Sequence, residues 1–369
     1  MSAPVTILAS RPAIETIDTP ALLVDLDVFE ANMAKIVARC AAEGVAWRPH
    51  CKSHKCPAIA KLQIAAGAIG VTCAKLAEAE AMADAGISDI MIANQIVGPI
   101  KIARLMALRA RADVVVAVDS VQNVAALAAA AQAAGVRLRV VIEIDSGMNR
   151  AGVVPGEAVV ALARLVASHQ SLQFAGVMTW EGHTSRIADP DDKRRAIEEA
   201  LISVIDSAAL CHAAGLPVAI VSCGGTGTYE TSAGVAGITE IQAGGGIFGD
   251  VHYRELYHVP VGYGLTVLST VTSRPNAQRV ICDAGKKAMS TDAGEPIPLD
   301  VPPVASTGFS AEHGKIELSA PSEMPRVGDR IRFVVGYSDT TIHLHDEIYA
   351  VRNGRVEQVW RIPRTARLR

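Results

Sequence analysis

Short apolar strands alternate with helical segments along the first two-thirds of this 369-residue chain, and this alternation limits the possible folds more than any other feature. The intervening segments are rich in Ala, Leu, Glu and Lys and carry the helical period, as from Val121 to Ala134. Several of them close on a glycine such as Gly135, a residue that favours helix ends. The predicted strands are Val45–Arg48, Ile69–Thr72, Ile90–Ala93, Val114–Val118, Leu138–Ile144, Phe174–Thr179, Val218–Ser222 and Glu240–Ala243.

Eight such units fit a closed (β/α)8 barrel of the TIM type, which usually takes about 250 residues. A doubly wound open sheet shows the same local pattern and is the main alternative. Polar residues at the strand ends favour the barrel, because the carboxyl ends of barrel strands converge on one face. In an open sheet the same residues would be spread along an edge. They are Lys52, Lys75, Asn94, Asp119, Asp145, Arg150, Glu181, His183 and Thr226.

After Gly262 the pattern changes to short alternating segments separated by Pro and Gly turns, which indicates an antiparallel β-domain. The sequence therefore predicts an α/β protein, a (β/α)8 TIM-type barrel with an appended C-terminal antiparallel β-domain. We assign residues 16–260 to the barrel, and residues 1–15 with 261–369 to the β-rich domain. The early run Val5–Leu8 joins the second domain. Its other predicted strands are Val267–Thr272, Arg279–Asp283, Arg330–Val335, Glu347–Arg352 and Gln358–Arg361.

Composition narrows the class of protein. A formal net charge of −3 and the lack of a basic stripe with aromatic residues argue against nucleic acid as a partner. Seven cysteines without a CxxC pair indicate reduced thiols in a cytoplasmic protein. The N-terminus lacks the pattern of a signal peptide. The longest uncharged stretch, Ser207 to Tyr229, contains Pro217 and a glycine cluster, so we expect no membrane span.

The most distinctive motif is a basic segment, residues 47–55, in which an apolar run ends in two lysines and two histidines. A lysine at a strand end beside other cations can have its amine pKa lowered enough to attack a carbonyl, as a Schiff-base enzyme requires. Lys52 is the candidate. The alternative interpretation is a solvated basic loop.

Two glycine-rich loops, residues 223–228 and 244–246, follow the seventh and eighth predicted strands. Barrels often bind a phosphate with backbone N–H groups from these two loops. Thr226 or Thr228 could add hydroxyl donors, and glycine lets the backbone approach the anion closely. A pair of tight turns is the alternative.

A phosphate loop, a strand-end lysine and a barrel with a β-domain together suggest pyridoxal 5′-phosphate (PLP). The sequence also resembles the D-threonine aldolase and D-serine dehydratase family, within the alanine racemase-like, fold-type III PLP enzymes. The resemblance covers nearly the whole chain. Its landmarks are Thr19-Pro20-Ala21-Leu22-Leu23-Val24-Asp25, Arg48-Pro49-His50-Cys51-Lys52-Ser53-His54-Lys55, Asp145-Ser146-Gly147-Met148-Asn149-Arg150-Ala151-Gly152, Gly224-Gly225-Thr226-Gly227 and Asp283-Ala284-Gly285.

The resemblance assigns roles to several of these residues. It implies that Lys52 binds the cofactor covalently through its amine, and that Arg150 hydrogen-bonds the phenolic oxygen of the ring. It places Gln242 near the pyridine nitrogen, where racemases of this fold have an arginine. It also implies a homodimer. The phosphate would be held by Gly225, Thr226, Gly227, Gly244 and Gly245.

The implied reaction is a retro-aldol cleavage of D-threonine or a related small-molecule D-3-hydroxy amino acid, giving glycine and an aldehyde. A base removes the β-hydroxyl proton, and in D-threonine aldolases a divalent cation (Mn, Mg, Zn or Co) acidifies it. The first alternative is dehydration of D-serine or another D-3-hydroxy amino acid to ammonia and an oxo acid. The second is a non-catalytic PLP-binding protein, which ranks lower because such proteins lack an appended β-domain.

The chain departs from the family pattern at the base. Family aldolases usually carry a histidine after the sixth barrel strand, but here Glu181 stands at that position and His183 follows two residues later. Either side chain is a candidate base, and His183 needs less pKa tuning near neutrality. The alternative is that His183 only holds a loop.

A second departure concerns the metal. The family pairs a histidine with an aspartate or cysteine two residues on, whereas this chain has Tyr337 with Asp339. We predict Asp339 and His345 as the metal ligands. Ligands also remain at His343 and Asp346, and a strand here would put His343 and His345 on one face.

Overall fold

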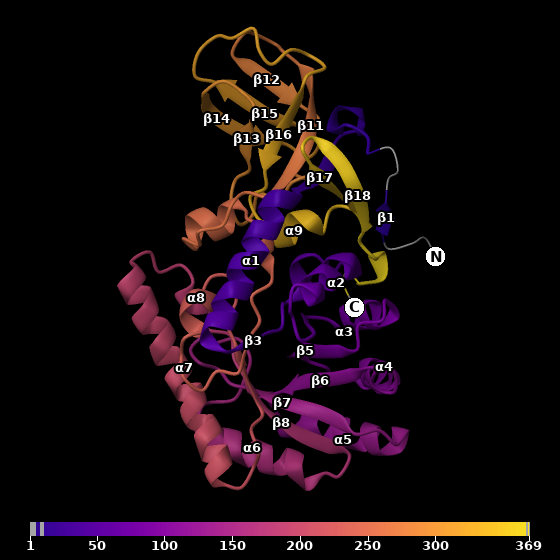
Figure 1. The fold of residues 1–369 in the computed structure, drawn as a ribbon, viewed down its shortest axis with the longest axis vertical. Coiled ribbons are helices and arrows are strands. Elements are labelled where there is room, and N and C mark those ends of the chain that lie inside the picture. Colours follow the sequence, from indigo (N-terminus) through magenta and orange to yellow (C-terminus); the bar gives the residue numbers. More distant parts are fainter. Residues whose placement is uncertain (1–4, 8–10, 367, 369) are drawn as a thin grey trace. The chain divides into compact units, whose positions relative to one another are not determined.

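The computed structural model describes residues 5–7, 11–366 and 368, and its chain divides into two compact units (Figure 1). One unit comprises Ala34–Gly244, with a few residues from the C-terminal end of the chain. The second comprises the residues up to Met33 together with Gly245–Arg364. The division falls within helix α1, Leu26–Glu43.

The unit Ala34–Gly244 is built on an eight-stranded parallel sheet, and all eight predicted strands are confirmed to within two residues at each end. Neighbouring strands in the sheet follow the order β3-β10-β9-β8-β7-β6-β5-β4. The strands are β3 (Ala46–Trp47), β4 (Val71–Cys73), β5 (Asp89–Gln95), β6 (Asp113–Val118), β7 (Leu138–Glu143), β8 (Leu172–Met178), β9 (Ile220–Cys223) and β10 (Glu240–Ile241).

Hydrogen bonds between the first and last strands of this order close the sheet into a barrel. The Ile69 N–H donates to Trp47 O at 2.9 Å, and the Thr72 N–H donates to Pro49 O at 2.9 Å. His50 and Thr72 form a parallel bridge just beyond β3. The predicted closed barrel is therefore confirmed over the open sheet.

Apolar side chains from adjacent strands pack into one cluster that includes Met91, Val115, Val141 and Ile220. Gln242, which follows β10, donates from Nε2 to Met91 Sδ on β5 at 3.8 Å. Because β10 and β5 are not neighbours in the sheet, this contact crosses the barrel and identifies the cluster as its interior. The helices of this unit beyond α1 are α2 (Pro57–Ala65), α3 (Leu76–Asp84), α4 (Pro99–Arg109), α5 (Val121–Ala134), α6 (Glu157–Ser168), α7 (Pro190–Ala213) and α8 (Tyr229–Ser232).

The other unit is built on a largely antiparallel sheet, which confirms the predicted β-domain as an architecture. β1 (Val5–Ile7) pairs with β18, so this run belongs to the β-rich domain as predicted, while Leu8 lies outside the described residues. Asn353 and Gly354 have φ values of 51° and 69°, as the predicted hairpin turn requires. The remaining strands are β2 (Ala21–Asp25), β11 (Leu265–Ser273), β12 (Arg279–Cys282), β13 (Ile297–Leu299), β14 (Val304–Phe309), β15 (Gly314–Leu318), β16 (Arg330–Val334), β17 (Glu347–Arg352) and β18 (Arg355–Arg361).

The bounds of the two units differ from the predicted 16–260 and 1–15 with 261–369. Residues 16–33 and 245–260 belong with the antiparallel sheet, not with the barrel. β2 pairs with β11 and with β17 in that sheet. Its residues Ala21 to Val24 are all buried, so they show no alternation and look like a barrel strand in the sequence.

The segment after β16 also differs from expectation, because it is helical. Helix α9 spans Ser338–Ile342, His343 lies at its C-terminal end and His345 follows in a turn. The buried Asp250 carboxylate accepts the Ser338 N–H at 2.7 Å and so stabilises the first turn. The expectation that His343 and His345 alternate on a strand face is therefore wrong. Among the described helices, none has the length and apolar composition needed to cross a membrane.

Candidate active site

Lys52 lies in a short 3-10 turn, Cys51–Ser53, that follows β3 at the carboxyl end of the barrel. His50 begins this turn, and its Nδ1 accepts the backbone N–H of Lys52 at 3.3 Å. On the other side, the fully buried His54 accepts the Cys56 N–H at 3.0 Å through Nδ1. Histidine acceptors therefore fix the backbone before and after Lys52, whose side chain is exposed.

The other lysine of the basic segment is held inside the unit. Lys55 Nζ lies 3.0 Å from Oε1 of the buried Glu78, and Glu78 Oε2 accepts the Ala74 N–H at 2.7 Å. A solvated basic loop would expose these groups. The segment is instead a packed loop that leaves the Lys52 side chain exposed.

Charges from opposite parts of the barrel converge near His50. Its pKa lies well below the ordinary histidine value, first because of burial and then because of the nearby charges of Lys52, His54 and Arg150. Arg150 follows β7, and three strands separate β7 from β3 in the sheet. Closure of the barrel thus places Arg150 and Lys52 near enough for both charges to act on the same imidazole.

Arg150 also lies beside the acidic side chain of Glu143 at the barrel end. Its Nη2 is 3.9 Å from Glu143 Oε1, and Gln95 Nε2 donates to Glu143 Oε2 at 2.5 Å. Burial raises the pKa of Glu143, and the Gln95 hydrogen bond and the Arg150 charge oppose that rise. The guanidinium of Arg150 therefore has a buried carboxyl next to it that limits its movement.

The loop after β9 is held in place by hydrogen bonds to Glu181. The carboxylate of this fully buried residue accepts the Thr228 hydroxyl and the Ser232 hydroxyl, each at 2.7 Å, and the Gly224 N–H at 3.3 Å. A Cβ at Gly225 would lie 2.4 Å from the Trp180 ring, so only glycine allows this approach. The carboxylate oxygens of Glu181, a predicted candidate base, are thus engaged in hydrogen bonds that hold the glycine loop and helix α8.

The loop after β10 lies against the loop that carries Lys52. A Cβ at Gly244 would be only 2.2 Å from the backbone oxygen of His50. Gln242 is buried just before it and donates from Nε2 to Ser222 Oγ at 2.8 Å, inside the barrel. Thr226 is buried in the neighbouring glycine loop, whereas Gly245 is the first residue of the other unit.

His183, the other candidate base, lies in the 3-10 turn Gly182–Thr184 after β8 and is exposed. Its ring contacts the loop that carries Arg150, because a Cβ at Gly147 would lie 3.0 Å from His183 Nε2. That loop is held by Asp145, whose Oδ1 accepts the Gly147 and Asn149 N–H groups at 3.0 Å each. His183 is thus placed beside the Arg150 loop.

These residues fit PLP. The cofactor needs an amine for its aldehyde, donors for its phosphate and a donor for its ring oxygen. The barrel end offers Lys52, two close-packed glycine loops and Arg150 from strands that closure brings together. Three residues of this arrangement were missed in the sequence: His50, Glu143 and Trp180. Glu143 could have been found, because it is an acidic residue at the end of a strand whose preceding residues, Val140 to Ile142, are apolar.

The predicted metal residues lie in the other unit, and their donor set does not fit a metal. Asp339 Oδ1 accepts the Tyr253 hydroxyl at 3.4 Å, while His345 Nε2 forms a 2.8 Å hydrogen bond with Ala288 O. Burial raises the pKa of Tyr337, with Asp339 adding to the rise. Throughout the described part of the chain, no three His, Cys, Asp or Glu side chains are placed to share a metal.

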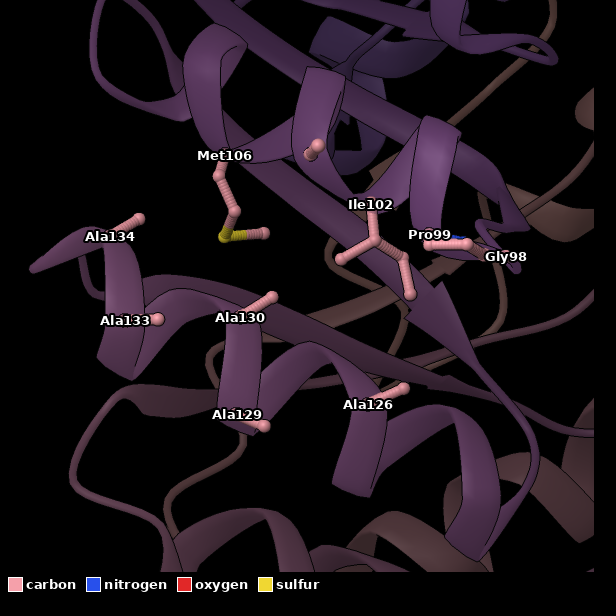
Figure 2. Close-up of a pocket in the computed structure, with 10 residues that line it drawn as sticks. Gly98, Pro99, Ile102, Met106, Ala126, Ala129, Ala130, Ala133 and Ala134 are labelled. Carbon is pink, nitrogen blue, oxygen red and sulfur yellow. The ribbon is translucent and has the colours of Figure 1, made fainter.

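A separate cavity lies between helices α4 and α5 (Figure 2). Ile102 and Met106 extend from α4 toward a row of alanines on α5 that includes Ala126 and Ala130. Every lining residue is apolar, so this cavity offers no group for acid–base or covalent chemistry. The candidate active site is therefore the carboxyl end of the barrel.

Comparisons with known proteins agree with this geometry. The model for the alanine racemase N-terminal domain matches residues 24–252, and a serine dehydratase domain model matches residues 264–351. A D-threonine aldolase from an Arthrobacter species is 36% identical over 94% of this chain and 92% of its own length. A 3-hydroxy-D-aspartate aldolase from Paracoccus denitrificans is 37% identical over 93% and 91%.

Solved structures extend the likeness to the whole fold. The D-threonine aldolase of Filomicrobium marinum superimposes with a TM-score of 0.93, at 36% identity, covering 100% of this chain and 99% of that one. The chain belongs to the D-threonine aldolase and D-serine dehydratase family. A D-threo-3-hydroxyaspartate dehydratase from Delftia sp. HT23 superimposes with a TM-score of 0.86 at 30% identity over 95% and 99%. The chain is thus a PLP-dependent lyase, as its sequence predicts.

Proposed function

We propose that the protein cleaves D-threonine or a related D-3-hydroxy amino acid into glycine and an aldehyde. The observation that carries this function is that the charges of Lys52 and Arg150 both act on His50, while the exposed His183 lies against the loop that carries Arg150. Aldolases also match the chain at 36–37% identity over at least 93% of its length. The Delftia dehydratase sequence matches 76% of it.

Each barrel residue has a task in this reaction. When bound, PLP supplies an electron sink for the substrate bond that breaks at Cα. Lys52 would hold the cofactor through its amine. Arg150 remains charged at neutral pH, so it donates hydrogen bonds at the ring oxygen without losing a proton. The glycine loops, with Gly225, Thr226, Gly227 and Gly244, hold the phosphate.

Proton transfer falls to His183. Its Nε2 accepts the β-hydroxyl proton while the Cα–Cβ bond breaks and a carbonyl forms at Cβ, so that an aldehyde leaves. Cα then gains a proton and glycine is released. Glu181 is less suited to this task because its carboxylate is buried and accepts three hydrogen bonds. Gln242 leaves the pyridine nitrogen without a charged partner on this interpretation.

Dehydration is the second candidate, because a serine dehydratase domain model matches residues 264–351 and the Delftia relative is a dehydratase. It would break the bond between Cβ and the hydroxyl oxygen and give ammonia and an oxo acid. The two reactions share the site, so their products separate them. A non-catalytic PLP-binding protein finds no support among these relatives.

Product analysis tests the proposal. The PLP-loaded protein is incubated with D-threonine and with 3-hydroxy-D-aspartate, and glycine, aldehyde, ammonia and oxo acid are each measured. We expect glycine and aldehyde in equal amounts. Ammonia and oxo acid in their place would establish the dehydratase, and no turnover of either substrate would contradict both lyase functions.

Lys52 gives the matched test of the cofactor site. Lys52→Ala is expected to lose the absorbance of the lysine-bound cofactor and all turnover, because no other amine replaces it at this position. Lys61→Ala, on the exposed face of α2, is the control and should retain both. An unchanged spectrum in Lys52→Ala would reject this site.

Two further expectations belong to the proposal. None of the seven cysteines, all of which lie in the described part of the chain, forms a disulfide, which supports a reducing cytoplasmic location. The family resemblance supports a homodimer. Sedimentation of the purified protein at several concentrations measures its mass, and a monomer at all of them would contradict the dimer.

A further inference from the structure

The segment that corresponds to the family's metal site is built differently in this chain. Tyr337 stands where the family has a histidine ligand, and Asp339 follows two residues later at the start of α9. A cysteine-to-alanine variant of the related D-threo-3-hydroxyaspartate dehydratase was solved in a form described as metal-free. This description implies that the relative also has a metal-bound form. The replacement of an imidazole by a phenol is a change of donor chemistry, because imidazole is a common ligand of divalent ions.

The Tyr337 hydroxyl takes part in a compact hydrogen-bonded group. It donates to the Asp339 carboxylate and accepts from the Tyr253 hydroxyl. Tyr253 in turn donates to Asp339 Oδ1 at 3.4 Å. We call these three residues, Tyr253, Tyr337 and Asp339, the tyrosine–carboxylate cluster. Two phenols thus compete with any cation for the oxygens of the one carboxylate.

Packing keeps the cluster in place. The ring of Tyr337 lies 5.7 Å from that of Tyr253 and 4.4 Å from that of His252, centroid to centroid. His252 Nδ1 is hydrogen-bonded to Ala293 O at 2.7 Å. The buried Asp250 accepts the N–H groups of Tyr253 and Ser338, each at 2.7 Å, and thereby joins the two segments that supply the tyrosines.

Among the residues that the structure describes, no alternative set of ligands is placed to bind the cation instead. The Nε2 atom of His345 is engaged with the carbonyl of Ala288. Within residues 5–7, 11–366 and 368, no group of three His, Cys, Asp or Glu side chains could hold a metal ion. We propose that the tyrosine–carboxylate cluster has replaced the family's divalent cation site, and that Tyr337 is the substitution that excludes the cation.

Metal binding tests this directly and needs no activity. The PLP-loaded protein is dialysed to equilibrium against Mn²⁺ and separately against Zn²⁺, and bound metal is measured by elemental analysis. The wild-type chain should bind no equivalent of either ion at this site. Tyr337→His should gain one equivalent, which the double variant Tyr337→His with Asp339→Asn should lose.

Tyr257→His is the matched control, because the Tyr257 ring also stacks on His252, at 4.3 Å, but lies outside the cluster. It should gain no metal. One equivalent bound by the wild-type chain and lost in Asp339→Asn would overturn the proposal. Failure of a folded Tyr337→His to bind any cation would also overturn it, because Tyr337 would then not be what excludes the metal.

A second arm rests on the proposed function. Turnover by the wild-type enzyme should be the same with and without a chelator such as EDTA, and added Mn²⁺ should not raise it. A tenfold loss on chelation, reversed by Mn²⁺, would overturn the proposal. If the protein turns over none of the substrates, the metal-binding measurement still tests whether the cation site has been replaced.

Discussion

At the scale of single residues, His183 and Glu181 are two positions apart in sequence but differ in burial and partners. We expect His183→Asn to lower kcat by about 100-fold or more, because a positioned general base contributes about 10²–10⁴. Cofactor absorbance and thermal stability should be unchanged, since His183 is exposed. Steady-state kinetics with D-threonine measures this. His212→Asn, on the exposed face of α7, is the control, and equal effects in both variants would contradict the assignment.

Glu181 should behave as a positioning residue. Glu181→Ala removes the acceptor of the Thr228, Ser232 and Gly224 donors and leaves them buried. A hydrogen bond contributes about 0.5–1.5 kcal/mol net, so the loss of these three should lower the free energy of unfolding by about 2–4 kcal/mol.

The same variant should bind PLP more weakly while kcat at saturating cofactor changes much less than in His183→Asn. Denaturant unfolding and cofactor titration measure the two effects, with Glu199→Ala on the exposed face of α7 as the control. A fully stable variant with normal PLP affinity and no turnover would make Glu181 the base instead.

At the scale of elements, the close approach of two loops sets a limit on the phosphate site. Gly244→Ala would place a Cβ 2.2 Å from His50 O, so the loop carrying Lys52 must shift. We expect weaker PLP binding and a lower melting temperature. Gly308→Ala is the control, because a Cβ there meets nothing closer than Lys315 Cε at 3.5 Å. Cofactor titration and thermal unfolding measure both, and normal values for Gly244→Ala would refute the contact.

The elements also show where sequence pattern suffices and where it does not. The barrel strands could be predicted because each apolar run is bounded by helices and polar residues, as at Val114–Val118. β2 could not be assigned to the right sheet, because a strand buried on both faces carries no alternation to identify its partners. Helix α9 was missed because its start depends on the distant Asp250, whose contact with Ser338 spans 88 residues.

The site was predicted to a similar degree, for related reasons. Lys52 and Arg150 were identified because strand ends of a barrel must converge, whatever the spacing in the sequence. The role of Glu181 could not be read locally, since its partners lie 43 to 51 residues further along the chain. The loss of the metal ligand was visible at Tyr337, but its hydrogen bonds with Tyr253 required the fold.

At the scale of the whole molecule, the chain forms a parallel barrel and an antiparallel sheet. The residues at which one ends and the other begins could not be predicted from local sequence patterns. Residues 16–33 join the antiparallel sheet although they precede the barrel, so that sheet needs both ends of the described chain. Truncation after residue 260 should therefore leave β2 without β11 and β17. We expect such a fragment to lose cooperative unfolding in this part, measured by hydrogen exchange at Ala21 to Asp25. Full protection there would contradict the pairing.

Global stability should depend on pH through His54. Burial lowers the pKa of His54 to about 4, while in the unfolded chain it titrates near its ordinary value of about 6.5. Between these values the unfolded state binds more protons than the folded state, so the free energy of unfolding falls as the pH falls. The slope from one such group is about 1.4 kcal/mol for each pH unit. His50, whose pKa is also lowered, acts in the same direction.

A variant isolates this contribution. His54→Asn removes the titration but retains an acceptor for the Cys56 N–H, so its stability should be lower at pH 7 and fall less steeply toward pH 5. Urea unfolding at a series of pH values gives the two slopes. His212→Asn, exposed on α7, should keep the wild-type slope. If His54→Asn also keeps the wild-type slope, then His54 binds a proton as readily in the folded protein as in the unfolded chain. Burial would then not keep the His54 imidazole neutral.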